Sequence, residues 1–289
     1  MIKKKIIDAL LDKKELRSLD KEFVKSVIEK TKNENPSLYS ELTKKEFNQK
    51  SKEFKEFKKI ARKKLRAIYG VFSKSHVSKN KKEKFIENTK SALDSKDSEK
   101  EKELAKKLLK THISTNERLK YYELVYEKLF LITGMPDSIC DLGCGYNPFS
   151  YVFLNCKPKY VATDISTEDM TFINNYFKIK NVPGKAFQAD LTKSEDVLKV
   201  SKETKNFDIC LCFKLLDSLE SKHKGASREL LSSLNCKYII VSFPKKTISG
   251  KNSISGKRLW FTRILEEQGL NMTRFEVGNE EYLLLHKND

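Results

Sequence analysis

The spacing of apolar residues divides the chain into a helical first part and a second part in which strands and helices alternate. Ahead of residue 111 the apolar positions recur every three or four residues, which is typical of one face of a helix. They include Ile6, Leu10, Phe23, Val27, Phe54, Phe57 and Leu65. From Ser138 onward, near-continuous apolar runs are typical of strands buried on both faces of a parallel sheet. We therefore expect an all-α domain over residues 1–111 and an α/β domain over residues 112–289.

The second part is predicted to form one sheet with helices between its strands. The first strand begins at Ser138, and further strands are predicted over residues 159–163, 185–189, 207–213 and 237–243. Helices are expected over residues 148–154, around 227–234 and over 258–268, followed by a strand pair over 272–277 and 281–285. That last pair would complete a mostly parallel sheet of seven strands.

The first part is predicted to be a small helical bundle. One helical stretch covers residues 2–30, and a second, continuous or interrupted, runs from about Leu38 to Tyr69. Asn33-Glu34-Asn35-Pro36 breaks the pattern between them. The Ser-, Asp- and Lys-rich piece 91–100 is expected to be a flexible link.

A capping box is predicted where the two parts meet. Ser114 is followed three residues later by Glu117, so a helix is expected to start at about Thr115. Arg118 would then lie in the first turn, where a cation is mildly unfavourable. It is therefore either solvent-facing or placed to bind an anion.

A glycine turn follows the first predicted strand, at Cys140-Asp141-Leu142-Gly143-Cys144-Gly145. Glycine tolerates positive φ and lets the backbone approach a ligand closely. Asp141 comes at the end of the strand, which is where α/β sheets place their ligands. Alone, this turn also fits an ordinary strand–turn–helix unit with a surface acid.

Two further acids follow the next two strands. Asp164 comes 23 residues after Asp141, close to the spacing at which nucleotide-binding sheets place the acid for the ribose hydroxyls. Asp190 could accept a hydrogen bond from an adenine amino group, and Leu191 could pack on the ring. Because the third glycine of the dinucleotide fingerprint is absent, a cationic nucleoside ligand fits this set better than a dinucleotide.

Positive charge is concentrated in the first part. The formal net charge is +18, and residues 1–110 supply +15 of it. The 26 residues from Phe57 to Lys82 contain no acid. A polyanion such as RNA is favoured as the partner over an anionic membrane or an ordinary solvated helix face. The candidate phosphate-binding residues are Lys58, Lys59, Arg62, Lys63, Lys64 and Arg66, with Lys245, Lys246 and Lys251 in a basic loop beyond the fifth strand.

The cysteines predict no metal site. None of the six forms a C-x-x-C pair, and the chain has four histidines. Reduced thiols in the core of a cytoplasmic protein are the favoured interpretation. No apolar segment reaches the length of a spanning helix, and no signal-peptide pattern opens the chain.

Several motifs together resemble one family. They are His112-x-Ser114-Thr115-x-Glu117-Arg118-Leu119, Asp141-Leu142-Gly143-Cys144-Gly145-Tyr146-Asn147-Pro148, Val241-Ser242-Phe243-Pro244 and the basic helix that ends in Lys64-Leu65-Arg66-Ala67-Ile68-Tyr69. The set resembles the 16S ribosomal RNA guanine-N7 methyltransferases of aminoglycoside resistance. The resemblance implies a Rossmann-like class I methyltransferase domain that uses S-adenosylmethionine (SAM), behind an all-α RNA-binding domain. It also implies that the small ribosomal subunit is the partner; a monomer is expected.

The resemblance also implies roles for individual residues. Arg118 would bind the SAM carboxylate, with Ser114 nearby. Gly143 and Gly145 would line the methionine part beside Asp141. Asp164 would hold the ribose, Asp190 with Leu191 would hold the adenine, and Ile165 would also contact the cofactor. Phe213 and Lys214 would border the sulfonium and the target base.

Methylation at guanine N7 needs no general base, because N7 carries a free lone pair. No acid or base pair is therefore predicted, and catalysis would rest on proximity. Phe243 and Trp260 are candidates for stacking on the target base, with core packing as the alternative for Phe243. Two other functions remain open: a SAM methyltransferase for another RNA base, a protein or a small molecule, and a SAM-binding RNA adaptor without turnover.

Overall fold

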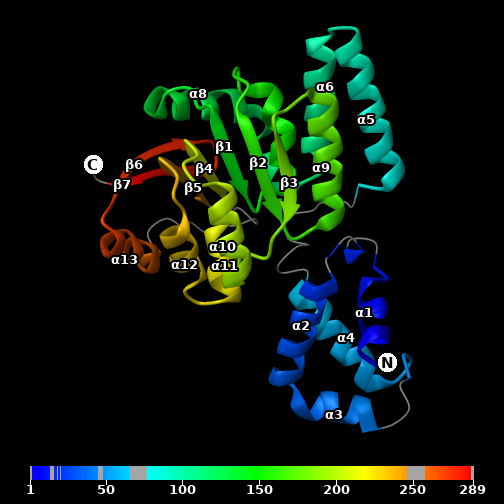
Figure 1. Cartoon of the computed structure of the whole chain (residues 1–289). Coiled ribbons are helices and arrows are strands. Elements are labelled where there is room, and N and C mark those ends of the chain that lie inside the picture. The colour runs from blue at the N-terminus through cyan, green and yellow to red at the C-terminus, as the bar shows by residue number, and fades with distance from the viewer. Residues whose placement is uncertain are drawn as a thin grey trace.

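The computed structural model comprises two bodies, a small helical bundle and a larger sheet domain (Figure 1). The structure describes residues 2–13, 16–17, 19, 21–44, 48–65, 77–245 and 258–287. The strands β1 to β3 point toward the bundle, so the carboxyl edge of the sheet faces it (Figure 1). In the part of the chain that is described, no helix combines the length and apolar character needed to cross a membrane.

The bundle is built around its own apolar core. Its helices are α1 (Ile2–Leu11), α2 (Lys21–Glu34), α3 (Pro36–Lys44) and α4 (Lys52–Leu65). Phe54 and Phe57 are fully buried in that core, as predicted. The second predicted helical stretch is interrupted, because α3 ends at Lys44 and α4 begins at Lys52. Pro36 opens α3, a position where its missing N–H costs nothing.

Two long helices lie between the bundle and the sheet in the chain, α5 (Lys79–Asp94) and α6 (Ser98–Leu109). The predicted flexible link at 91–100 is wrong. These residues form the end of α5, a tight turn and the start of α6, which Asp97 caps by accepting a hydrogen bond from the Lys100 N–H. Both helices pack on the sheet domain, where the Phe85 ring of α5 meets Phe149 edge-on at 5.4 Å between centroids. The packing favours a domain division between residues 65 and 77, ahead of the proposed one at 111/112.

The sheet has the predicted seven strands, in the order β3-β2-β1-β4-β5-β7-β6. Its strands are β1 (Ser138–Leu142), β2 (Lys159–Asp164), β3 (Gly184–Gln188), β4 (Ile209–Phe213), β5 (Tyr238–Pro244), β6 (Leu270–Val277) and β7 (Glu280–Lys287). The first five are parallel, and β7 is antiparallel to both β5 and β6. The expected class of α/β fold is confirmed.

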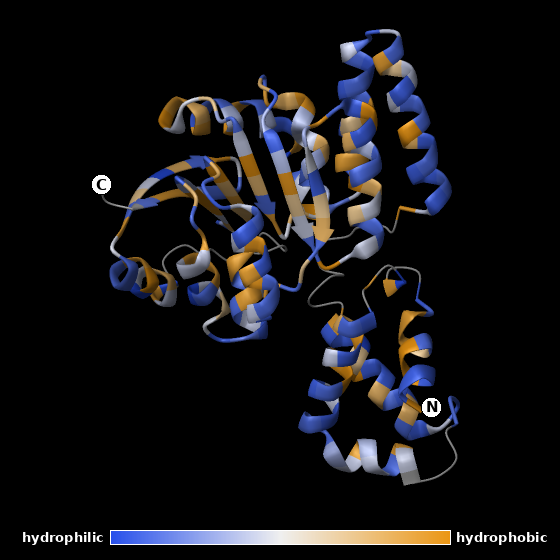
Figure 2. Cartoon of the chain, in the orientation of Figure 1, coloured by the Kyte–Doolittle hydropathy of each residue, from blue (hydrophilic) through white to orange (hydrophobic). Residues whose placement is uncertain are grey.

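Helices cover both faces of the sheet. One face carries α8 (Tyr122–Thr133), η4 (Asn147–Phe153), α9 (Thr167–Lys180), α5 and α6. The other carries α10 (Ser194–Glu203), α11 (Leu216–Lys222), α12 (Ala226–Ser233) and α13 (Leu259–Gln268). Alternate strand residues serve the two cores: Ile139 and Ile209 face the first, and Cys140 and Cys210 the second. Figure 2 shows the resulting apolar colouring along the strands.

One predicted helix differs in type, and one helix was not predicted. Residues 147–153 form a 3-10 helix, η4, where an α-helix was expected over 148–154. Helix α11, which follows β4, was not predicted, because its seven residues are too short for a periodic pattern. It closes the pocket described next.

Candidate active site

One pocket opens at the carboxyl edge of the sheet, between β1, β2 and β4. All ten residues predicted to bind the cofactor line it: Ser114, Arg118, Asp141, Gly143, Gly145, Asp164, Ile165, Asp190, Leu191 and Phe213. Lys214 lines it as well, together with His112, Asn147 and Lys222, to which no role was assigned. The structure therefore brings together, in one cavity, residues that lie as far apart as Ser114 and Lys222.

The glycine turn forms the floor of this pocket. Gly143 and Gly145 have φ of 60° and 50°, a region that favours glycine. A Cβ atom on Gly143 would lie 2.6 Å from Leu215 Cδ1, so no larger residue fits without a shift. The Gly145 N–H donates to Asp164 Oδ2 at 2.8 Å, and the Ile165 N–H donates to Oδ1 at 2.7 Å. The turn after β1 is thus tied to the acid at the end of β2.

Asp141 is buried and only partly satisfied. Its Oδ2 accepts from Asn147 Nδ2 at 2.9 Å and from the Tyr160 hydroxyl at 2.7 Å. Its Oδ1 is buried without a hydrogen-bond partner among the described residues. Burial raises the pKa of this carboxyl to about 6. A cationic ligand group that donates to Oδ1 would satisfy the oxygen and favour the charged form, so the site fits an ammonium group such as that of SAM.

Arg118 is not where the capping box predicted it. Helix α7 (Ile113–Arg118) begins earlier, with His112 in the N-cap position, so Ser114 lies inside the helix and Arg118 in its last turn. A cation is favourable at that end. Glu117 does not reach back to cap the helix but forms an ion pair with Lys214. The Arg118 side chain is 2% exposed, which rules out the solvent-facing alternative.

The Arg118 guanidinium is held from three sides. Its Nη2 donates to Glu280 Oε2 at 2.9 Å and its Nη1 to Asn147 Oδ1 at 3.2 Å. Its Nε faces Glu280 and the Tyr282 hydroxyl, and the Phe213 ring lies 4.4 Å away. Each terminal nitrogen carries two N–H groups, so these bonds leave one N–H on each for a ligand carboxylate. Although burial alone lowers it, the pKa of Arg118 is raised because Glu280 favours the charge.

Lys214 lies at the end of β4 in a left-handed backbone conformation, with φ of 54°. This conformation is uncommon for a lysine and is held by the Lys214 N–H, which donates to the backbone oxygen of Ser242 at 3.0 Å. Its Nζ lies 3.2 Å from Glu280 Oε1 and also pairs with Glu117. Glu280 thus joins Arg118 and Lys214.

Sequence reasoning missed Glu280. It begins β7, and it reaches the site only because β7 lies next to β5 in the sheet. No local pattern distinguishes it from Glu281, its neighbour. Asn147 was visible as part of a motif, but its double contact with Asp141 and Arg118 could not be predicted from spacing.

Phe243 does not line the pocket. Its ring is 1% exposed and packs edge-on against Phe261 at 5.2 Å, with the Arg258 guanidinium 4.2 Å from its centroid. The prediction that Phe243 stacks on a target base is therefore wrong, and core packing is confirmed. Trp260 is partly buried against the same cluster. Phe213 is the aromatic side chain of β4 that lines the pocket.

The predicted phosphate-binding residues have different environments. Lys59 and Lys63 are exposed on α4. Arg62 donates to the backbone oxygen of Ala9 at 2.7 Å and so caps the end of α1. Lys58 lies over the Phe54 ring, Lys64 pairs with Glu34, and Lys245 pairs with Glu276. Arg66, Lys246 and Lys251 lie outside the described residues.

The cysteines are free thiols, and three of them meet in space. The Sγ atoms of Cys140, Cys210 and Cys236 lie within 4.8 Å of one another, beneath the sheet and away from the pocket. Their spacing along the chain gives no hint of this cluster. The expectation that the protein binds no metal stays a prediction.

These features define the class of the protein. A sheet of this strand order, with a glycine turn after β1 and acids after β2 and β3 converging on one pocket, is a class I methyltransferase domain, whose cofactor is SAM. The family is shown by a match over residues 30–285 to the family described as "Ribosomal RNA methyltransferase (FmrO)". The chain belongs to this family of ribosomal RNA methyltransferases.

Individual relatives agree with this assignment. The chain is 31% identical over 244 residues to a 16S rRNA (guanine(1405)-N(7))-methyltransferase from Proteus mirabilis, covering 81% of this chain and 85% of that protein. A protein of the same name from Micromonospora echinospora is 27% identical over 201 residues, which are 68% of this chain and 71% of the relative. The crystal structure of the 16S rRNA methyltransferase RmtF with S-adenosyl-L-homocysteine has the same fold, with a TM-score of 0.73 at 22% identity over 99% of this chain and 98% of that one.

Proposed function

We propose that this enzyme transfers the methyl group of SAM to the N7 atom of a guanine in 16S ribosomal RNA, within the aminoglycoside-binding decoding site. The proposal is carried by one observation: a pocket that fits SAM lies at the sheet edge facing a basic helical bundle, in a chain that aligns over most of its length with guanine-N7 methyltransferases. The substrate would be the small ribosomal subunit, met by a monomer in the cytoplasm. Methylation there would give resistance to aminoglycosides.

The pocket has two ends of different chemistry. At the methionine end, lined by Arg118, Asp141 and Asn147, Arg118 would bind the cofactor carboxylate and Asp141 the ammonium, with Glu280 behind the pocket wall holding Arg118 in place. At the adenosine end, formed by Asp164, Ile165, Asp190 and Lys222, Asp164 would accept from the ribose hydroxyls and Asp190 from the adenine amino group. Leu191 would pack on the ring.

The proposed reaction needs no general acid or base from the protein. Bound SAM supplies an electrophilic methyl group, and guanine N7 already carries a free lone pair. The residues around the reacting atoms therefore act by orientation and by excluding water. Phe213, the last residue of β4, and Lys214, the next residue, line the pocket, where the Phe213 ring would border the target base. Lys214 pairs with Glu280 and Glu117 and would neutralise their negative charge next to the target base.

The bundle would supply affinity through phosphates. Lys59 and Lys63 are exposed on α4, and such cations position a folded RNA without reading its sequence. Lys246 and Lys251, which lie outside the described residues, stay predicted phosphate-binding residues.

Methyl transfer from radiolabelled SAM to three substrates in parallel tests the proposal. The substrates are small ribosomal subunits, free 16S RNA and a protein extract, and the Asp164→Ala variant serves as the inactive control. We expect label in the RNA of small subunits and none with the variant. Label in protein or small molecules alone would contradict the substrate assignment while leaving the cofactor site intact.

A further inference from the structure

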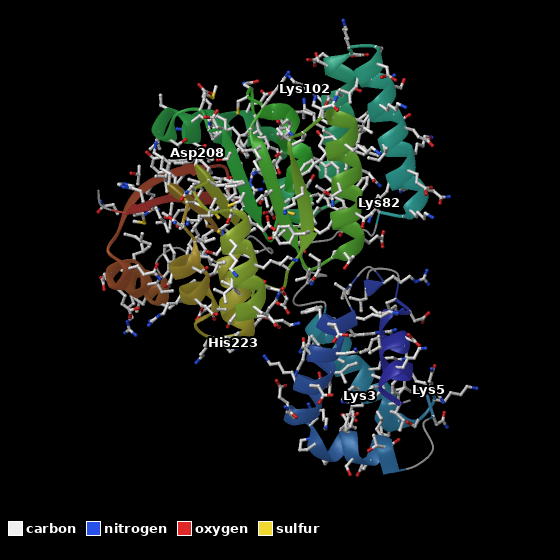
Figure 3. All side chains as sticks on the ribbon, viewed as in Figure 1. Lys3, Lys5, Lys82, Lys102, Asp208 and His223 are labelled. Atoms are coloured by element: carbon white, nitrogen blue, oxygen red, sulfur yellow. The ribbon has the colours of Figure 1, made fainter. Side chains whose placement is uncertain are left out.

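Helix α2 of the bundle touches the wall of the cofactor pocket. Lys222, the last residue of α11, lines the adenosine end beside Asp164 and Asp190. The Lys30 ammonium donates to the Lys222 backbone oxygen at 3.1 Å, and the Lys222 ammonium lies 5.7 Å from the centre of the Phe23 ring. Figure 3 labels His223, the next residue, at the end of α11 near the bundle. We refer to Phe23 and Lys30 against Lys222 as the α2–α11 contact.

A second residue of the same end meets the bundle. Ile165 lines the pocket directly after Asp164 and packs on the apolar core of helices α1 to α4. Its N–H donates to Asp164 Oδ1, so its position also fixes the carboxylate. Both of these contacts fall at the adenosine end; at the methionine end, the residues that hold Arg118 and Asp141 come from the sheet domain.

Lys222 supplies the positive charge that faces the carboxylates at the adenosine end of the pocket. Burial lowers the pKa of Lys222, and the carboxylates of Asp190 and Asp164 oppose that shift. Burial also raises the pKa of Asp164, and Lys222 acts against this effect. An opposite charge favours the ionised form of a carboxyl, so Lys222 helps to keep Asp164 able to accept hydrogen bonds from a ligand.

We propose that the α2–α11 contact couples the two domains. The docked bundle raises the affinity of the adenosine end for the cofactor, and the bound cofactor raises the affinity of the enzyme for RNA. This inference rests on the proposed function. A docked bundle holds Lys222 and Ile165 in place, and it also fixes the distance between the basic face of α4 and the pocket. Because coupling between two ligands is reciprocal, each should raise the affinity of the other by the same factor.

The first test measures the affinity of the full chain for S-adenosylhomocysteine by calorimetry. Lys222→Met keeps the apolar stem on Phe23 and removes the charge; Phe23→Ala and Lys30→Ala change only the bundle side. We expect about a tenfold loss for Lys222→Met and about fivefold for Phe23→Ala, both within the usual range of coupling energies, and a smaller loss of about twofold for Lys30→Ala. Adding Phe23→Ala to Lys222→Met should cost less than the product of the two losses.

Matched controls separate coupling from general damage. Lys21→Ala removes an exposed lysine from the same helix, and Lys224→Met removes one two residues beyond Lys222; both should leave the affinity unchanged. Lys30 is exposed, so its variant keeps the bundle packing intact even where Phe23→Ala does not.

The second test measures binding to small ribosomal subunits with and without S-adenosylhomocysteine. We expect the cofactor product to tighten binding of the natural chain about fivefold and to have little effect on Lys222→Met. Unchanged cofactor affinity in both Phe23→Ala and Lys30→Ala would overturn the inference. A natural chain that bound no S-adenosylhomocysteine would contradict the proposed function instead.

Discussion

The two ends of the pocket are built in different ways. At the methionine end, Arg118 is surrounded by Glu280, Asn147 and Tyr282, all from the sheet domain and all buried. At the adenosine end, Ile165 and Lys222 are contacted by the helical bundle. The first end is built within the sheet domain alone, from α7, η4 and β7. The second needs both domains, and it is therefore where RNA on the bundle can influence the cofactor.

The largest effect is expected from Glu280, because it neutralises two buried cations. Glu280→Ala would leave Arg118 and Lys214 without their shared partner, and breaking a buried ion pair costs about 3–5 kcal/mol of stability. Urea denaturation measures the loss. Glu276→Ala, which removes an acid from the exposed pair with Lys245, should cost far less, because solvent screens surface ion pairs. Equal losses in the two variants would mean that the methionine end is not held by this charge network.

A smaller effect concerns pH and Asp141. Burial raises the pKa of Asp141 from 3.8 unfolded to about 6 folded, so the folded state binds this proton more tightly. Its contribution to stability is present below pH 4 and is lost as the pH rises toward 6, by about 2–3 kcal/mol.

The Asp141→Asn variant should not show this fall in stability between pH 4 and 6. The difference between its curve of stability against pH and that of the natural chain therefore gives the contribution of Asp141. The subtraction is needed because burial lowers the pKa of His112 from 6.5 to about 4. The folded state binds that proton less tightly, so the stability of the protein falls for this reason as the pH drops below 6.5, opposite to the effect of Asp141. Parallel curves for the two proteins between pH 4 and 6 would contradict the burial of a charged Asp141.

Asp141→Asn should also weaken the binding of S-adenosylhomocysteine, because a neutral amide replaces the carboxylate that would face the ligand ammonium. We expect about a 10- to 100-fold loss at pH 7.5, the size of a charge-assisted hydrogen bond. Calorimetry on the folded variant measures it. Asp137→Asn, on the opposite edge of the sheet, is the matched change and should have no effect. Undiminished affinity of Asp141→Asn would exclude Asp141 from the site.

The smallest effect is expected on the bundle. Lys59→Gln with Lys63→Gln removes two exposed charges and should lower the slope of log affinity against log salt by about 1.5, if both contact phosphates. Binding to small subunits across a salt series measures the slope. Lys106→Gln with Lys107→Gln makes the same charge change on α6. If that pair lowers the slope as much, net charge rather than the α4 surface governs binding.

Much of the site was predictable because its signals are local. The turn at Gly143 and Gly145 requires residues without a side chain, and Asp164 and Asp190 follow strands at a spacing that the parallel sheet imposes. These positions converge whatever the details of the loops. The positions of the seven strands likewise followed from apolar runs of strand length, whereas their order in the sheet did not.

What could not be predicted depends on partners that are distant in sequence. Glu117 looks like a helix cap, but Lys214 from β4 forms an ion pair with it. The apolar residues of α5 and α6 do not show in the sequence which core they face, and in the structure Phe85, Leu108 and Leu109 pack in the core of the sheet domain. Lys222 lies on a helix too short to show a pattern.

The most direct measurement maps the modified atom. Small ribosomal subunits treated with the enzyme and SAM are reacted with borohydride and aniline, which cleave RNA at N7-methylguanine, and the cut is located by primer extension. We expect a single cut at a guanine of the decoding site, absent when Asp164→Ala replaces the natural chain. Methylated 16S RNA that resists cleavage would show that another atom accepts the methyl group, and would contradict guanine N7 as the target.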